Sequence, residues 1–427
     1  MCVRSGNRCP GPLEGPLIVD MTASAKDGMR RRRALQPTRK SWDPSVYLDR
    51  IDVQGSIEAI IIEAFYRDFL TYFTTEGEGE DIQNKLTWLQ LLPNLAADTS
   101  DYALVLVLQS TATAYGGIMT LNTPLTQHAR HLYGIALQTY YHLLKQSRSR
   151  TNFTVHMVST SVLFSFFEAM QATTAEAYLA HIYGAARLLE VTGPGQCAHG
   201  VLCQLFYHVR TQMLFAQLAT EHHNVPVAVR NILFDLLSYK DPPLIQRLMC
   251  CIAALQELHA QSSDQSHSSL ALQVQQLWNG YLRQKTSQNP RWYDASRGTV
   301  LFDDAFAALT MAYFSSAHIF LTQLIQPGAA ESQKAARYHR FILDAATYLD
   351  TTRNAIAYMR MATPLLLVAL HSPDHAYRKT AIETFRLWSK GCMRGISTLA
   401  LNALRRQEGR TYDVRGCDRV PELPLPD

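Results

Sequence analysis

From residue 56 onward, the apolar side chains of this chain recur at helical spacing. Ile57, Ile61, Phe65 and Phe69 stand four residues apart and form one face of a helix, behind Ser56 as a candidate N-cap. Alternating runs of β-branched residues between turn dipeptides, which would indicate strands, are scarce. With 427 residues and 47% apolar content, the chain can bury a large core. We therefore predict an all-α fold, a single large multi-helical domain that follows a disordered, basic N-terminal segment.

Apolar stripes and helix-stop residues predict where individual helices lie. A helix over 175–192 is the best delimited, with Thr173 or Thr174 as its N-cap and Gly193-Pro194 as its stop. Residues 154–171 are apolar on most sides, which is typical of a central buried helix. A further stripe is marked by Leu132, Ala136, Tyr140 and Leu143. The other expected helices cover 101–120, 201–221, 301–325, 334–352, 355–371 and 375–402.

Positive charge is concentrated in the N-terminal segment. Residues 1–50 carry ten Lys and Arg against five Asp and Glu, a balance of +5; the whole chain carries +4, so the remaining 377 residues sum to −1. A nearly neutral body is a poor electrostatic footprint for nucleic acid, whose binding depends on phosphate neutralisation. The dense basic run Arg30, Arg31, Arg32 and Arg33 is interpreted as a nuclear import signal, a contact to DNA phosphates, or a solvated tail. We expect residues 13–55 to be a disordered basic linker, 56–405 the helical domain and 406–427 a flexible tail.

The cysteines and the apolar runs of the sequence indicate in which cellular compartment the protein is expected. The eight cysteines suggest no disulfide framework, and the N-terminus lacks the apolar stretch of a signal peptide. The longest apolar runs, Leu104 to Leu108 and Pro364 to Leu370, are shorter than a membrane span. A reducing intracellular compartment and no membrane partner are therefore expected.

Two cysteines near the N-terminus carry a family resemblance. Cys2 and Cys9 frame six residues and precede Pro10-Gly11. This arrangement resembles the end of the Zn2Cys6 binuclear zinc cluster, a fungal DNA-binding module, although Pro12 stands where that family usually has tyrosine. By this resemblance, residues 1–12 are a remnant of the cluster, with Cys2 and Cys9 as its fifth and sixth ligands. Two thiolates do not satisfy even one tetrahedral zinc, so zinc is expected only if the missing upstream cysteines exist. A start site that omits an upstream exon and a true loss of the cluster both stay open as explanations.

Segments of the helical region resemble the fungal-specific transcription factor domain. The strongest match runs from His181 through Gly184-Ala185 and Leu188-Leu189 to Gly193-Pro194. Residues 163–169, with Glu168 at a commonly acidic position, 210–216, 362–369 and 378–388 are also similar. The resemblance covers roughly residues 56–400 and implies a nuclear regulator of RNA polymerase II genes, including those of biosynthetic gene clusters. Its implied partners are DNA in a full-length form, the transcription machinery or co-regulators, and a second copy of the chain.

Catalytic and metal-binding patterns are weak by comparison. The sequence has no G-x-S-x-G, phosphate-loop or H-E-x-x-H motif, so we expect it not to be an enzyme. Asp303-Asp304 is interpreted as a helix N-terminus, and Cys250-Cys251 as buried thiols that act as small hydrophobes. A second cluster has a spacing that matches no common zinc site: Cys197, His199, Cys203 and His208.

One group of apolar side chains has two interpretations. Its members are Phe164, Phe166, Phe167, Met170, Met213 and Phe215. They either line a pocket for a small effector molecule or form part of the core, and core packing is the commoner role at helical spacing. Two other classes of protein also stay open, namely a helical scaffold or co-regulator that does not bind DNA and an all-α enzyme without a recognisable site.

Overall fold

A computed structural model describes eleven ranges of the chain. They are residues 63–72, 88–97, 101–146, 153–220, 227–234, 243–261, 267–288, 293–294, 298–324, 329–352 and 355–414. All of them belong to the second of the two units into which the chain divides, Ala59–Asp427. The predicted cluster remnant with Cys2 and Cys9, the linker and Arg30, Arg31, Arg32 and Arg33 lie outside the described residues.

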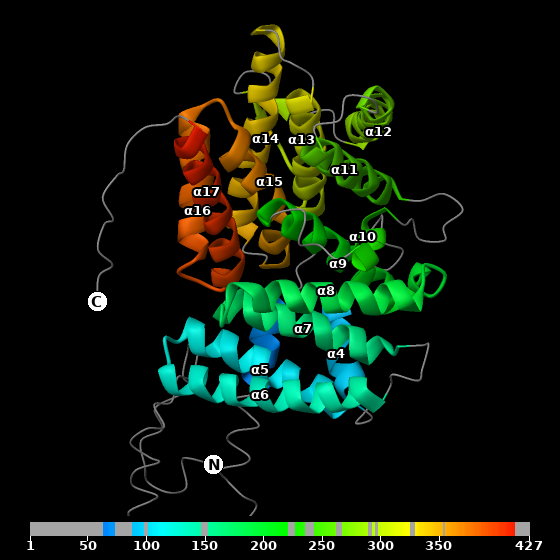
Figure 1. Ribbon diagram of the computed structural model, residues 1–427, viewed down its shortest axis with the longest axis vertical. Coiled ribbons are helices and arrows are strands. Elements are labelled where there is room, and N and C mark those ends of the chain that lie inside the picture. Colours follow the sequence, from blue (N-terminus) through cyan, green and yellow to red (C-terminus); the bar gives the residue numbers. More distant parts are fainter. Residues whose placement is uncertain are drawn as a thin grey trace, which may run out of the picture. The chain divides into compact units, whose positions relative to one another are not determined.

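The described part of the chain is almost entirely helical, which confirms the predicted all-α fold (Figure 1). Residues 63–72 are helical. The helices that follow are α4 (Trp88–Ala97), α5 (Tyr102–Met119), α6 (Thr123–Gln146), α7 (Val155–Gln171), α8 (Ala175–Thr192), α9 (Gly200–Ala219), α10 (Val227–Phe234), α11 (Leu244–Gln261), α12 (His267–Gln288), α13 (Ala305–Leu324), α14 (Ala329–Thr352), α15 (Ala355–His371), α16 (His375–Trp388) and α17 (Arg394–Val414). A 3-10 helix, η3, covers Gln196–Ala198. Two short strands that the sequence did not predict, β1 (Tyr293–Asp294) and β2 (Thr299–Val300), pair antiparallel, with Tyr293 opposite Val300.

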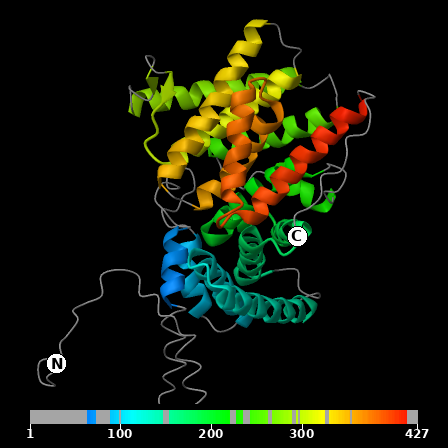
Figure 2. The same ribbon diagram turned by 90° about the vertical axis from the view of Figure 1, so that its left-hand side faces the viewer.

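Helix α7 lies at the centre of its group of helices. Every residue from Met157 to Gln171 is buried, as the apolar pattern of 154–171 predicts. It packs against α5 on one side and α8 on another, while α5 and α6 form an antiparallel pair (Figure 2). Helix α9 contacts α7 and α8 and also α11 and α15, and α13 in turn packs on α11, α14 and α15. A single hydrophobic core therefore runs through all of these helices.

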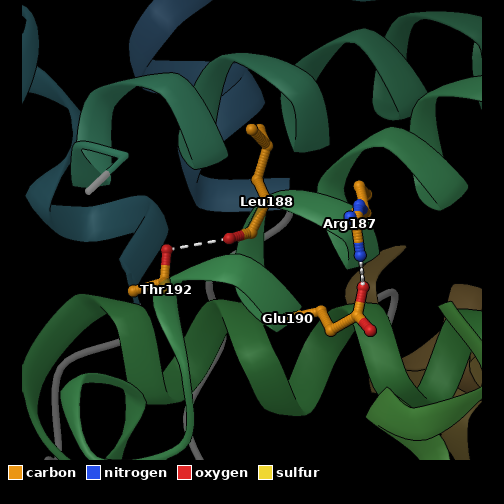
Figure 3. Close-up of polar contacts among 4 residues, drawn as sticks. All are labelled: Arg187, Leu188, Glu190 and Thr192. Carbon is orange, nitrogen blue, oxygen red and sulfur yellow. Dashed lines mark hydrogen bonds and ion pairs between the residues drawn. The ribbon is translucent and has the colours of Figure 1, made fainter. Parts of the chain in front are cut away.

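The ends of α8 show how local sequence sets a boundary. The Thr174 side chain accepts a hydrogen bond from the Ala177 amide at 3.1 Å, and Gly193 follows the last turn with a φ of 84°, a conformation that favours glycine. In that last turn the Thr192 hydroxyl donates to the Leu188 carbonyl at 2.8 Å, and Arg187 pairs with Glu190 (Figure 3). The predicted range 175–192 and its Thr174 cap are confirmed.

The predicted helix over 375–402 is wrong in one respect, because residues 389–393 form a turn that divides it into α16 and α17. Ser389-Lys390-Gly391 ends α16, and the Ser389 amide closes its last turn onto the Phe385 carbonyl at 2.9 Å. The new direction brings Gly395 against the end of α7, where a Cβ would overlap the Glu168 carbonyl oxygen. Helix α17 then continues to Val414, beyond residue 405.

Among the described residues, two helices meet the length and composition of a membrane span, contrary to the expectation from short apolar runs. They are α5 and α13. In this fold 72% of the apolar window of α5 and 89% of that of α13 are buried against other helices. Buried core helices can also have the length and composition of a membrane span, and the burial of α5 and α13 is typical of such core helices.

Candidate functional site

The aspartate pair lies at a helix start, as interpreted from the sequence. Asp304 Oδ1 accepts a hydrogen bond from the Ala307 amide at 2.7 Å at the first turn of α13. Asp303 pairs with Lys285 of α12, whose side chain is largely buried. The N-terminal interpretation of Asp303-Asp304 is confirmed, and both carboxylates have structural partners.

Three members of the Cys and His cluster of η3 and α9 are buried, whereas His199, at the start of α9, is exposed. Cys197 and Cys203 are buried free thiols, and burial raises the pKa of Cys197 to about 12. The His208 ring contacts the Trp88 and Phe166 rings, with centroids 6.3 Å and 5.2 Å away. Burial, with Arg360 adding to it, holds the His208 pKa well below its usual value. Within the described ranges, no three His, Cys, Asp or Glu side chains are placed to hold a metal ion.

Arg210 gives the 210–216 segment a structural role that the sequence did not reveal. Its guanidinium is fully buried, and Nε donates to the Leu233 carbonyl at 3.0 Å in the last turn of α10. The same group donates to Gln246 Oε1 at 2.6 Å and to the Cys250 sulfur at 2.7 Å. A cation at a helix C-terminus is favourable, so Arg210 ties α10 and α11 to α9. Cys251 is a buried apolar thiol as predicted, whereas Cys250 is half-buried and accepts this bond.

The most unusual group in the core is the Glu168 carboxylate, which is fully buried in the last turns of α7. Tyr133 of α6 donates its hydroxyl to Glu168 Oε1 at 2.7 Å. Thr173 donates its amide to Oε2 at 2.9 Å, and its hydroxyl lies 2.6 Å and 2.7 Å from the two oxygens. Hydrogen bonds from the Tyr133 hydroxyl and from the amide and hydroxyl of Thr173 offset the cost of burying the carboxylate. We name Tyr133, Glu168, Thr173 and His181 the Glu168 junction.

His181 of α8 completes the junction. Its Nε2 lies 2.8 Å from the Tyr133 hydroxyl oxygen. Because that hydroxyl gives its proton to Glu168, the contact is satisfied when His181 carries a proton on Nε2 and donates it. Burial lowers the His181 pKa to about 4, so the ring is neutral at pH 7, and Phe164 stacks on it with ring centroids 5.0 Å apart. The chain His181–Tyr133–Glu168 therefore links three helices through neutral donors that end on one carboxylate.

The aromatic and methionine group proposed as a pocket lining is packed core. All of its members are at most 1% exposed, and Phe167 stacks on Tyr133 with centroids 4.1 Å apart. Of this group, Met170 alone reaches a hollow of about 280 Å³ that lies elsewhere, between the α5–α6 turn, the end of α7 and the α16–α17 turn. Three basic side chains line that hollow: Arg130, Lys390 and Arg394. No local pattern in the sequence indicates this group, because Arg130 lies on α6 and the other two lie at the α16–α17 connection.

Comparisons of the chain with protein-family models, with curated proteins and with solved structures gave no match. Two features of the described residues stand out. One is the Glu168 junction, of which Glu168 lies in residues 163–169 and His181 in residues 181–194. The other is the basic hollow beside it.

Proposed function

We propose that this chain is a nuclear transcription regulator whose helical body is a regulatory domain of the fungal zinc-cluster type. The body acts on RNA polymerase II genes through co-regulators or the transcription machinery. The N-terminal segment, with Cys2, Cys9 and the run Arg30, Arg31, Arg32 and Arg33, provides nuclear import and any contact to DNA. Zinc belongs to the protein only in a form that contains the remaining cysteines of the cluster.

The observation that carries the proposal is the packing of the family-like segments on one another. Residues 163–169 lie in α7, 181–194 in and just after α8, 210–216 in α9 and 362–369 in α15, and these helices contact each other in that order. Glu168 and His181, which come from two of these segments, share the hydroxyl of Tyr133. The residues that carry the sequence resemblance thus build one core, which supports a common regulatory fold over a chance likeness.

An enzymatic role has less support. Both oxygens of Glu168 accept hydrogen bonds from Tyr133 and Thr173. His181 Nε2 is hydrogen-bonded to the hydroxyl of Tyr133. A general acid or base must instead reach a proton of its substrate. The Glu168 junction is therefore best explained as a structural tie between helices.

The direct test is to bring the full chain to a promoter. Fused to an unrelated DNA-binding domain in fungal cells, the chain is expected to change the output of a reporter gene several-fold relative to that domain alone. A variant with all four arginines at 30–33 replaced by glutamine should keep this effect, because the fusion partner supplies nuclear import. Expressed without the partner, the same variant should fail to accumulate in the nucleus. A stably expressed fusion that leaves the reporter unchanged would contradict the proposal.

A further inference from the structure

The basic hollow is lined by three positively charged side chains. Arg130 reaches it from α6, Lys390 from the α16–α17 turn and Arg394 from the first residue of α17. All three side chains are exposed, and within the described residues none of them has an ion-pair partner. The lining contains no carboxylate. Three like charges around one hollow repel one another, so an anion that neutralises them would be favoured.

The remaining lining supplies donors and a small apolar wall. Thr123, Thr126 and Ser389 carry hydroxyls, and Gln171 carries an amide. Ile118, Leu121 and Met170 add apolar surface, and Leu121 projects at the rim with 90% of its surface exposed. At 280 Å³ the hollow is just below the size range of pockets for drug-sized ligands. It therefore suits a small molecule with one charged group and a modest organic part.

We propose that this hollow binds the phosphate monoester of a small organic molecule. Two guanidinium groups and one ammonium group match the doubly charged, three-oxygen face of such a phosphate, because arginine binds phosphate with paired hydrogen bonds and lysine acts as a point charge. The Thr123 hydroxyl and the Gln171 amide supply further donors, and the apolar wall receives the organic part. The Thr126 and Ser389 hydroxyls already donate to the carbonyls of Asn122 and Arg386. The site is independent of the transcriptional role proposed above.

The position of Arg394 gives this site a route to the core. The next residue, Gly395, packs directly on the Glu168 carbonyl and on the Ala169 backbone. Met170 and Gln171, which belong to the same last turn of α7, line the hollow. A ligand that holds Arg394 would therefore brace the contact between α17 and α7, next to the Glu168 junction.

A different explanation assigns the three cations to the fold itself. Helices α5 and α7 end beside the hollow, and basic side chains near a helix C-terminus stabilise it. In that case, removing a cation would lower thermal stability and leave ligand affinity unaffected. The two explanations thus differ in one measurable quantity.

The test is calorimetric titration of the full chain at fixed ionic strength with phenyl phosphate, inorganic phosphate and succinate. Phenyl phosphate is expected to bind best, inorganic phosphate more weakly because it lacks the apolar part, and succinate least. Arg130→Gln and Arg394→Gln are each expected to weaken phenyl phosphate binding about tenfold or more. Arg386→Gln is the matched control, because Arg386 is exposed on α16, carries the same charge and does not line the hollow.

Several outcomes would overturn the proposal. One is no binding of either phosphate compound to the unchanged chain. Another is an equal loss in the Arg386 variant, which would indicate unspecific charge attraction. A third is a lowered melting temperature in the Arg130 and Arg394 variants without any loss of affinity. Binding of an acidic peptide in place of the phosphate compounds, abolished by Arg130→Gln, would instead identify the surface as a protein docking site. Lys390→Gln provides a further test if either arginine variant fails to fold.

Discussion

Glu168→Gln is expected to lower the free energy of unfolding by about 3 kcal/mol. The glutamine has nearly the same shape, but one oxygen becomes an NH2 group that meets the donors of Thr173 or Tyr133. Those buried donors then lose their acceptor, and a buried unsatisfied donor costs more than a lost hydrogen bond. The contact with His181 weakens as well, because the Tyr133 hydroxyl is no longer fixed in direction.

Chemical denaturation at pH 7 followed by circular dichroism measures this change. Glu383→Gln is the matched control: Glu383 lies on the surface of α16, with 54% of its side chain exposed, and pairs with Lys379, whose side chain is 66% exposed. Its replacement should alter stability by less than about 0.5 kcal/mol. Tyr133→Phe removes one hydrogen-bond donor and no charge. Its effect on the free energy of unfolding should lie between those of the Glu168 and Glu383 variants. A Glu168 variant as stable as the Glu383 variant would show that the junction does not hold α6, α7 and α8 together.

Acidification is expected to destabilise the fold strongly between pH 6.5 and pH 4. Burial lowers the pKa of both His318 and His339 to about 4, and the pKa of His371 to about 3. Above pH 6.5 these rings are neutral in both the folded and the unfolded chain. As the pH falls below 6.5, these histidines become protonated in the unfolded chain and stay neutral in the folded chain. The free energy of unfolding therefore decreases until the pH reaches the pKa of the histidines in the folded chain. At pH 5.5 the loss is about 1.4 kcal/mol for each histidine with a folded pKa of about 4, or about 3 kcal/mol for His318 and His339 together.

The same denaturation experiment, repeated from pH 7.5 to pH 4.5, tests the pH dependence. The half-buried Asp344, whose pKa is raised by desolvation, acts in the opposite direction and makes the slope less steep. His339→Asn should flatten the profile, because one group that resists protonation is gone. His128→Asn, on the exposed surface of α6, should leave the slope unchanged. A stability that stays constant from pH 7 to pH 5 would mean that the buried histidines are protonated in the folded chain.

Local patterns in the sequence were enough to locate several helices and their caps. The range 175–192, with Thr174 before it and Gly193 after it, agrees with α8 residue for residue. The range 355–371 agrees equally well with α15. The all-round apolar pattern of 154–171 correctly predicted the burial of α7. Helix boundaries and the buried face of a helix depend on residues close together in the sequence. The helical period, the N-cap residues and the glycine stops are local patterns and therefore predict them.

Features that depend on distant residues could not be predicted in this way. Tyr133 stands 35 residues from Glu168 and 48 residues from His181 in the sequence. The predicted stripe of Leu132, Ala136, Tyr140 and Leu143 does pack on the core, and Tyr133 is a further buried position that the stripe did not include. The basic hollow brings Arg130 of α6 together with Lys390 and Arg394, which lie about 260 residues further along the chain. Only tertiary packing brings such residues together, and a single sequence carries no record of it.

In the proposed function, the helical body regulates transcription, and any contact to DNA is made by the N-terminal segment. The measurement that tests it most directly is binding of the 427-residue chain to mixed-sequence DNA at increasing salt, with and without zinc. We expect weak binding that does not depend on zinc, is abolished by modest salt, and is lost when Arg30, Arg31, Arg32 and Arg33 are replaced by glutamine. Tight, zinc-dependent and sequence-selective binding that survives this replacement would contradict the claim, because the helical body itself would then have to read DNA.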